Sequence, residues 1–134
     1  SVGVTKVETK EQLQRAIDLA FTYDQHVLIE KEIKGREIEF AVFGNSDIKI
    51  LPPGEVLSNG QTYSYDAKYA AGGFSTTSKA ELSEEKIKEG MAFAKQAYIS
   101  AGCDGFARVD CFLDQKGQYY LNEINTIPGF TEIS

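Results

Sequence analysis

Apolar side chains recur at steps of three and four positions after Thr9, which predicts an amphipathic helix beginning near residue 10. Thr9 and Gln12 are spaced as a capping box, in which each side chain accepts a backbone N–H that the first helical turn leaves unpaired. The predicted apolar stripe consists of Leu13, Ala16, Ile17, Ala20 and Phe21. We expect this helix to serve as scaffold.

After the helix, apolar residues come in shorter runs and in alternation with polar ones, which predicts strands. The first strand is expected over 27–33, followed by a turn at Gly35. A second strand is expected over 37–43 and a short third one over 48–51. From 57 to 77 no period persists, and a segment this long is typical of a functional loop.

A second helix and a β-hairpin are predicted in the remainder of the chain. Ser83 can cap the amino end of the helix and Gly102 can end it. The expected buried stripe consists of Ile87, Met91, Ala94, Tyr98 and Ile99. The hairpin strands are expected over 106–113 and 119–124. This order of elements predicts an α+β fold with helices packed on an antiparallel sheet.

A two-residue loop at 116–117 would bring four polar side chains together on one face of the hairpin. Counting back from that loop places Asp110 opposite Glu123 and Arg108 opposite Asn125. Two carboxylates about 5 Å apart repel by roughly 3 kcal/mol at an effective dielectric near 20, so a positive group is expected between them. Carboxylate and amide oxygens are also the ligands that Mg²⁺ prefers. A surface hairpin with solvated charges is an equal alternative on this pattern alone.

Composition limits the classes of function. The chain has 134 residues, of which 42% are hydrophobic and 25% charged, as in ordinary globular domains. A net charge of -6 without a Lys/Arg cluster argues against a nucleic-acid partner, and no apolar run approaches the length of a membrane span. Cys103 and Cys111 lack metal-binding spacing, so we expect reduced thiols in a cytoplasmic protein.

Two motifs near the carboxyl end resemble the signature of the D-alanine:D-alanine ligases, an ATP-grasp family. They are residues 105–110 (GFARVD) and 121–131 (LNEINTIPGFT). Residues 1–4 are similar to the end of the family's phosphate-loop signature, 27–37 to its adenine-binding hinge, and 65–69 to its mobile omega loop. The matches follow the family's order along the whole chain.

The resemblance implies an α+β fold of the ATP-grasp type, with antiparallel-rich sheets and packed helices. It implies that 1–35 is part of the central subdomain with the adenine hinge. The remainder, 36–134, would be the C-terminal catalytic subdomain, with the omega loop at about 57–77. The implied reaction joins two D-alanines through an acyl phosphate for peptidoglycan synthesis. It uses ATP and two Mg²⁺, with Mn²⁺ as a substitute, in a cytoplasmic enzyme that is compatible with a homodimer.

The resemblance also assigns roles to individual residues. Those implied in ATP binding are Glu30, Lys31, Ile33, Glu37 and Lys68. Those implied as Mg²⁺ ligands are Asp110, Glu123 and Asn125. Those implied in catalysis are Arg108 at the transferred phosphoryl group, Gly129 in the oxyanion hole and Tyr69 on the omega loop. Ser134, together with Gly129, would bind substrate.

Several family features fall outside residues 1–134, namely the N-terminal domain, further phosphate-binding lysines and a closing helix. We therefore expect the chain to be a fragment without ligase activity of its own. The alternatives are a ligase that uses D-lactate or D-serine as second substrate, another ATP-grasp carboxylate–amine ligase, or a module that only binds nucleotide. Tyr69 favours D-alanine, because ligases for the other substrates differ at that position. The complete set of polar residues on the hairpin argues against the binding module.

Overall fold

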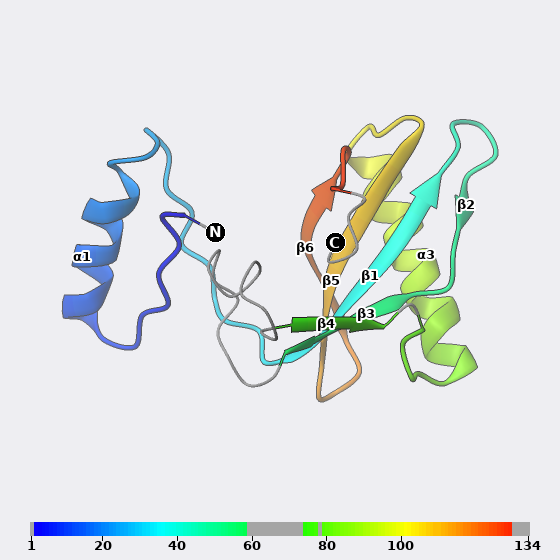
Figure 1. Cartoon of the computed structure of the whole chain (residues 1–134), viewed down its shortest axis with the longest axis horizontal. Helices are drawn as coiled ribbons and strands as arrows, with labels where there is room; N and C mark the ends of the chain where they lie inside the picture. The colour runs from blue at the N-terminus through cyan, green and yellow to red at the C-terminus, as the bar shows by residue number, and fades with distance from the viewer. Residues whose placement is uncertain (1, 59–73, 78, 130–134) are drawn as a thin grey trace. The chain divides into compact units, whose positions relative to one another are not determined.

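The computed structural model describes residues 2–58, 74–77 and 79–129, which divide into two compact units (Figure 1). The described part of the first unit is residues 2–32, and the second unit begins at Ile33. Neither α-helix in the described part of the chain has the length and apolarity needed to cross a membrane.

The first unit contains helix α1, Lys10–Ala20. Its capping box forms as predicted, because the backbone N–H of Gln12 donates to the Thr9 hydroxyl at 3.2 Å and that of Thr9 donates to the Gln12 side chain at 3.2 Å. The apolar stripe is half-buried, with one exception: Phe21 is 54% exposed. Including Phe21 in the stripe was wrong, because the helix ends at Ala20 and Phe21 is already its C-cap residue.

The strand predicted over 27–33 does not form. No described strand pairs with these residues, and Leu28 and Ile29 are 85% and 66% exposed. A strand is stabilised by the ladder it makes with a neighbour, so β-propensity alone cannot produce one. The prediction failed because it took an apolar run for a strand without knowing its partner.

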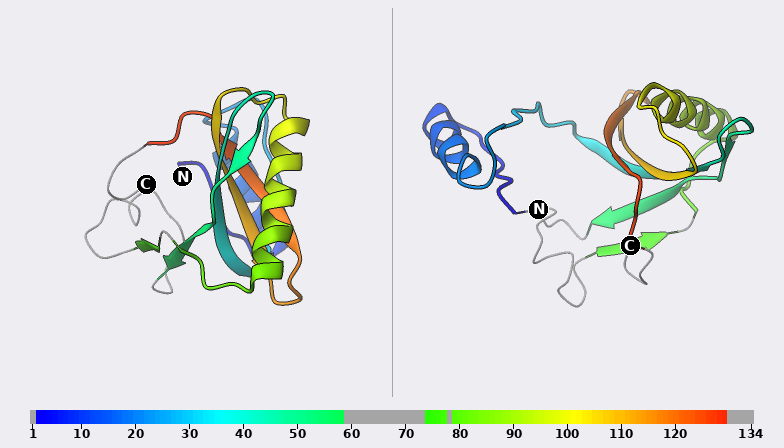
Figure 2. Two further views of the ribbon diagram at one scale, coloured as in Figure 1. Left: turned by 90° about the vertical axis from the view of Figure 1, so that its right-hand side faces the viewer. Right: turned by 90° about the horizontal axis from the view of Figure 1, so that it is seen from above.

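The second unit is built on an antiparallel sheet with the order β4-β3-β1-β5-β6, and β2 pairs with β1 beside it. Its strands are β1 (Gly35–Phe43), β2 (Lys49–Ile50), β3 (Gly54–Ser58), β4 (Phe74–Thr77), β5 (Phe106–Asp114) and β6 (Tyr119–Asn125). Helix α3, Glu84–Ser100, lies along one face of the sheet (Figure 2). The α+β class with an antiparallel sheet is therefore confirmed.

Two local expectations about this sheet were wrong. Both ends of the segment predicted as irregular contain strands, because β3 extends to Ser58 and β4 begins at Phe74. Gly35 is the first residue of β1 rather than a turn, and it pairs with Asp114 of β5. A Cβ at Gly35 would collide with the Leu113 carbonyl, so the strands can approach there only because the residue is glycine.

Helix α3 begins and ends where its sequence predicts. The Ser83 hydroxyl accepts the backbone N–H of Lys86 at 3.3 Å. Gly102 follows the C-cap with φ +67°, a conformation that glycine adopts without a steric penalty, and its N–H donates to the Ile99 carbonyl at 3.0 Å. Ile99 itself was wrongly placed in the buried stripe, because its side chain is 48% exposed.

The core lies between α3 and one face of the sheet. Alternate residues of β1 and β5 are fully or almost fully buried there, namely Ile38, Phe40, Val42, Ala107, Val109, Cys111 and Leu113. The helix packs tightly on the sheet at Gly90, where an added Cβ would lie 2.5 Å from Phe40 Cζ and 2.7 Å from Tyr119 Cζ. Because these buried residues point toward α3, the residues that alternate with them, among them Glu37, Glu39, Arg108 and Asp110, lie on the opposite face of the sheet.

A partly buried ion pair joins β1 to β3. Arg36 Nε and Nη2 donate to the two carboxylate oxygens of Glu55 at 2.7 and 2.6 Å, and Arg36 Nη1 donates to the Glu81 carbonyl at 3.0 Å. The side chain of Glu55 is 11% exposed and that of Arg36 is 40% exposed. If the ion pair were broken, water could therefore hydrate the Arg36 guanidinium more easily than the Glu55 carboxylate.

We expect Arg36→Met to destabilise the protein more than Glu55→Gln. The first substitution leaves a buried carboxylate without its cation, which costs about 3 kcal/mol in the free energy of unfolding. The second leaves a guanidinium that water can reach, so the expected loss is about 1 kcal/mol. Urea denaturation followed by circular dichroism measures both losses. Equal losses, or a larger loss for Glu55→Gln, would contradict the asymmetry.

Candidate functional site

The β5–β6 hairpin has the predicted pairing at its polar end: Arg108 is the Cα partner of Asn125, and Asp110 that of Glu123. The predicted two-residue loop is wrong, because the loop comprises residues 115–117, and the backbone N–H of Asp114 donates to the carbonyl of Gln118 at 3.0 Å. The pairs next to the loop are accordingly displaced by one residue.

A β-bulge between Asp110 and Cys111 restores the predicted register. Cys111 pairs with Leu121 whereas Asp110 pairs with Glu123, so Asn122 is the extra residue on β6. Without this bulge, the longer loop would have moved Glu123 out of line with Asp110. The local irregularity therefore decides which side chains meet at the site.

Four polar residues of the hairpin are linked by hydrogen bonds on the face opposite α3. Arg108 Nε and Nη2 donate to the two oxygens of Asp110, both at 2.7 Å. The side-chain nitrogen of Asn125 donates to Asp110 Oδ2 at 2.9 Å and to Glu123 Oε1 at 3.0 Å. The positive group that the sequence requires beside the carboxylates is therefore Arg108, in a bidentate, charge-assisted pair.

Asp110 is the most shielded acid of this cluster, with a side chain that is 13% exposed. Burial raises the pKa of Asp110 above its ordinary value, because a charged carboxylate loses hydration there. The Arg108 guanidinium and the Asn125 amide lower that pKa, and the Glu123 charge raises it, with burial the largest effect. A cation bound beside Asp110 would stabilise its charged form further.

Glu39 also belongs to the cluster, and sequence analysis did not find it. It lies on β1 as the Cα partner of Asp110, and its Oε1 is 3.5 Å from Arg108 Nε. The only signal in the sequence was that Glu39 alternates with the buried residues of β1, which places it on the polar face. Which strand would lie beside β1 could not be read from that alternation.

The donor atoms of the hairpin fit a hard divalent cation such as Mg²⁺. Asp110 and Glu123 offer carboxylate oxygens and Asn125 an amide oxygen, although the Asn125 amide would have to rotate to turn that oxygen toward the carboxylates. In the described part of the chain, no three His, Cys, Asp or Glu side chains are close enough to share a metal ion. Phosphate oxygens and water are the ligands that usually complete such a Mg²⁺ site.

Glu37, expected to bind ribose, lies two residues before Glu39 on the same face of β1. It is the Cα partner of Phe112 on β5 and of Val56 on β3. A pocket of about 240 Å³ at this point is lined by Gly35, Arg36, Glu37, Glu55, Val56 and Leu57. Glu37 and the hairpin cluster are thus presented by adjacent strands of one sheet.

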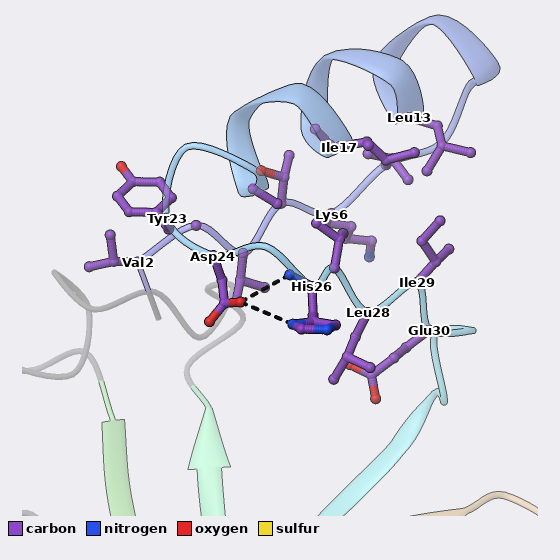
Figure 3. A pocket seen from close by; sticks show the side chains of 17 residues that line it. Val2, Lys6, Leu13, Ile17, Tyr23, Asp24, His26, Leu28, Ile29 and Glu30 are labelled. Atoms are coloured by element: carbon purple, nitrogen blue, oxygen red, sulfur yellow. Dashed lines mark hydrogen bonds and ion pairs between the residues drawn. The ribbon is translucent and has the colours of Figure 1, made fainter.

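The other residues expected to bind ATP are divided between the two units. Glu30 and Lys31 are exposed and belong to the first unit, whereas Ile33 is half-buried and belongs to the second. Glu30 is among the residues lining a pocket of about 530 Å³ in the first unit (Figure 3). Leu13 and Ile17 of α1 form part of its wall. The pocket therefore includes the apolar stripe of α1, which no described strand covers.

Among the remaining predicted residues, Gly129 is exposed and follows the end of β6. Lys68, Tyr69 and Ser134 lie outside the described residues. The geometry thus brings together Arg108 and the three predicted metal ligands, as the sequence led us to expect.

Known proteins match this chain along its whole length. The family model for the "D-ala D-ala ligase C-terminus" matches residues 1–134. The D-alanine--D-alanine ligases of Enterococcus hirae and Enterococcus faecalis are 44% and 43% identical over 134 residues. These matches cover 100% of this chain but only 37% and 38% of the two relatives. The chain therefore spans less than two fifths of the length of these curated relatives.

Two solved structures are also similar. The D-alanine-D-alanine ligase from Coxiella burnetii has a TM-score of 0.83 and 37% sequence identity, covering 99% of this chain and 34% of that one. The VanG D-Ala:D-Ser ligase from Enterococcus faecalis has a TM-score of 0.85 and 36% identity, covering 96% of this chain and 38% of that one.

Proposed function

Since the chain belongs to the D-alanine:D-alanine ligase family, we propose that it forms the ATP- and metal-binding part of an enzyme that joins two D-alanines for peptidoglycan synthesis in the cytoplasm. The observation that carries this proposal is the hydrogen-bonded cluster of Arg108, Asp110, Glu123 and Asn125 on one face of the sheet. In this proposal 1–35 is part of the central subdomain and 36–134 is the C-terminal catalytic subdomain.

The reaction consists of two transfers. In the first, a carboxylate oxygen of one D-alanine attacks the γ-phosphorus of ATP, and ADP leaves. In the second, the amine of the other D-alanine attacks the acyl phosphate, the carbon–oxygen bond to phosphate breaks, and the nitrogen loses a proton. Arg108 donates hydrogen bonds to the transferred phosphoryl group, and with the Gly129 N–H it stabilises the oxyanion of the tetrahedral intermediate.

Asp110, Glu123 and Asn125 would hold two Mg²⁺, or Mn²⁺ in their place, which neutralise phosphate charge when bound. The support for this assignment is the oxygen donor set and the buried position of Asp110. Glu37 would bind the ribose hydroxyls. Glu30, Lys31 and Ile33 would bind adenine.

Three further roles belong to the same proposal and fall on residues outside the described part. Lys68 would contact the phosphates, Tyr69 would help to exclude water, and Ser134 would bind the carboxylate of the second substrate. Exclusion of water matters because an acyl phosphate hydrolyses if water reaches it before the amine does.

A second candidate is a ligase that uses D-serine, because the VanG D-Ala:D-Ser ligase is among the similar structures. Tyr69 favours D-alanine over D-serine or D-lactate. Product analysis of the complete protein with each second substrate, by mass spectrometry, decides between them. Another carboxylate–amine ligase or a module that only binds nucleotide would yield none of these products.

The proposal predicts different behaviour for the complete protein and for residues 1–134 alone. We expect the complete protein to release ADP in a D-alanine-dependent manner and to form the dipeptide. We expect the isolated chain to be slower by several orders of magnitude, because residues that position substrates are supplied by the rest of the enzyme. A coupled ADP assay with Mg²⁺ measures both. A complete protein without D-alanine-dependent ADP release would refute the proposed function.

A further inference from the structure

We propose that Glu39 is a positioning residue that holds the Arg108 guanidinium in place while Asp110 binds a cation. This inference rests on the proposed function and adds a residue to its site. It gives Glu39 of β1 an indirect part in catalysis, through an arginine on the neighbouring strand.

Arg108 lies between two carboxylates from different strands. On its own strand, β5, both oxygens of Asp110 accept hydrogen bonds from it at 2.7 Å. On β1, Glu39 Oε1 is 3.5 Å from Arg108 Nε. The side chains of Arg108 and Glu39 are only 19% and 21% exposed, so water screens this pair less than it would screen a surface pair.

Asp110 cannot keep both hydrogen bonds to Arg108 and also bind a divalent cation without weakening one of the two interactions. In the structure, both of its oxygens are engaged by the guanidinium. A cation bound to either oxygen would lie close to the positive charge of Arg108 and repel it. Metal binding should therefore weaken the Arg108–Asp110 pair and release the guanidinium toward an anionic substrate.

Glu39 is the residue that can keep the released arginine at the site. It is the Cα partner of Asp110, so it faces the same part of β5. Its neighbours in the sequence, Ile38 and Phe40, are fully buried in the core, which fixes the backbone on either side of it. An anchor on a rigid central strand holds a catalytic group more closely than one on a loop would.

A different role for Glu39 would be that of a third metal ligand. Within the part of the chain that the structure describes, no three His, Cys, Asp or Glu side chains are spaced to share one ion. The ion-pair distance places Glu39 beside Arg108 instead. The two roles are separable, because only a metal ligand should lower metal affinity as much as kcat when it is replaced.

The test uses Glu39→Gln and Glu39→Asp in the complete protein, with Glu85→Gln on the exposed first turn of α3 as a control for loss of one acidic charge. For Glu39→Gln we expect kcat to fall about 5-fold, as for loss of an ion pair at the upper end of its usual strength, with the KM for ATP nearly unchanged. Glu39→Asp keeps the charge and should recover part of the loss. Mn²⁺ affinity, measured by electron paramagnetic resonance, should fall much less than kcat in Glu39→Gln and stay unchanged in Glu39→Asp, which keeps the negative charge.

Three outcomes would overturn the inference. They are an unchanged kcat in Glu39→Gln, a fall in Mn²⁺ affinity that matches the fall in kcat, or an equal fall in the Glu85→Gln control. If Glu39→Gln does not fold by circular dichroism, Glu39→Asp decides by the same criteria, since its shorter side chain should still lower kcat. A wild-type protein without D-alanine-dependent turnover would instead refute the proposed function, and this inference with it.

Discussion

Replacing Asp110 with Asn in the complete protein is expected to lower turnover at fixed Mg²⁺ by more than about 100-fold, the upper range for loss of a residue that only supports a metal ligand. Asn keeps the size of the side chain but removes the charge that attracts the cation. It also breaks the bidentate pair with Arg108. ADP release measured over a range of Mg²⁺ concentrations should show a lower maximal rate and a higher half-saturating concentration.

Asp114→Asn is a matched control for this substitution, because Asp114 lies on the same strand as Asp110. Its Oδ1 accepts backbone N–H groups from Lys116 and Gln118 at 2.9 Å, and an Asn side chain retains an oxygen that can do the same. We expect turnover close to wild type. Wild-type turnover in Asp110→Asn would exclude Asp110 as a metal ligand, provided that circular dichroism shows both variants folded.

The same site predicts how the metal requirement depends on pH. Burial raises the pKa of Asp110, so its carboxylate takes up a proton at a higher pH than an ordinary Asp does. Protons and Mg²⁺ compete for the carboxylate. The half-saturating Mg²⁺ concentration of the wild-type protein should therefore rise as pH falls toward the raised pKa.

Replacing Arg108 with Ala should lower kcat by about 1000-fold, the effect of removing an arginine that stabilises a transferred phosphoryl group. Arg108→Lys should not restore the rate, because an ammonium group cannot make the bidentate contact of a guanidinium. The KM for ATP should change much less, since the interaction develops mainly in the transition state. Steady-state kinetics of the complete protein separate the two constants.

Mn²⁺ affinity is a second measurement that tests the role of Arg108. Removal of a positive charge beside Asp110 should leave Mn²⁺ affinity equal or higher in Arg108→Ala, whereas loss of fold would abolish it. Arg15→Ala, on the exposed side of α1, is the control for loss of one arginine and should retain wild-type kcat. A kcat near wild type in Arg108→Lys would show that a positive charge is sufficient at this position.

The side-chain pairing in the β5–β6 hairpin was predicted correctly although the length of its loop was not. Strand alternation correctly placed Arg108 and Asp110 on one face of β5, and Val109 and Cys111 on the other, where they are buried in the core. The predicted loop was one residue too short, and the β-bulge after Asp110 compensates for the difference. The pairing of Asp110 with Glu123 was therefore predicted correctly, but the three-residue loop and the β-bulge that produce it were not.

Local signals in the sequence determined the parts of this protein whose interactions lie close together along the chain. The capping box at Thr9, the cap at Ser83, the stop at Gly102 and the alternation in β1 and β5 each depend on neighbouring residues. The family motifs at 105–110 and 121–131 likewise identified the cluster that the structure assembles.

Only the tertiary structure decided which segments lie beside one another. It shows that 27–33 has no partner among the described strands, and that β3 and β4 are strands because they pair. It also places Glu39 beside Arg108 and Arg36 beside Glu55, on neighbouring strands of the sheet whose residues are distant in the sequence. The physical reason is that strand pairing and the ion pairs it positions depend on the packing of the whole sheet, whereas helix caps and alternation depend on a few consecutive residues.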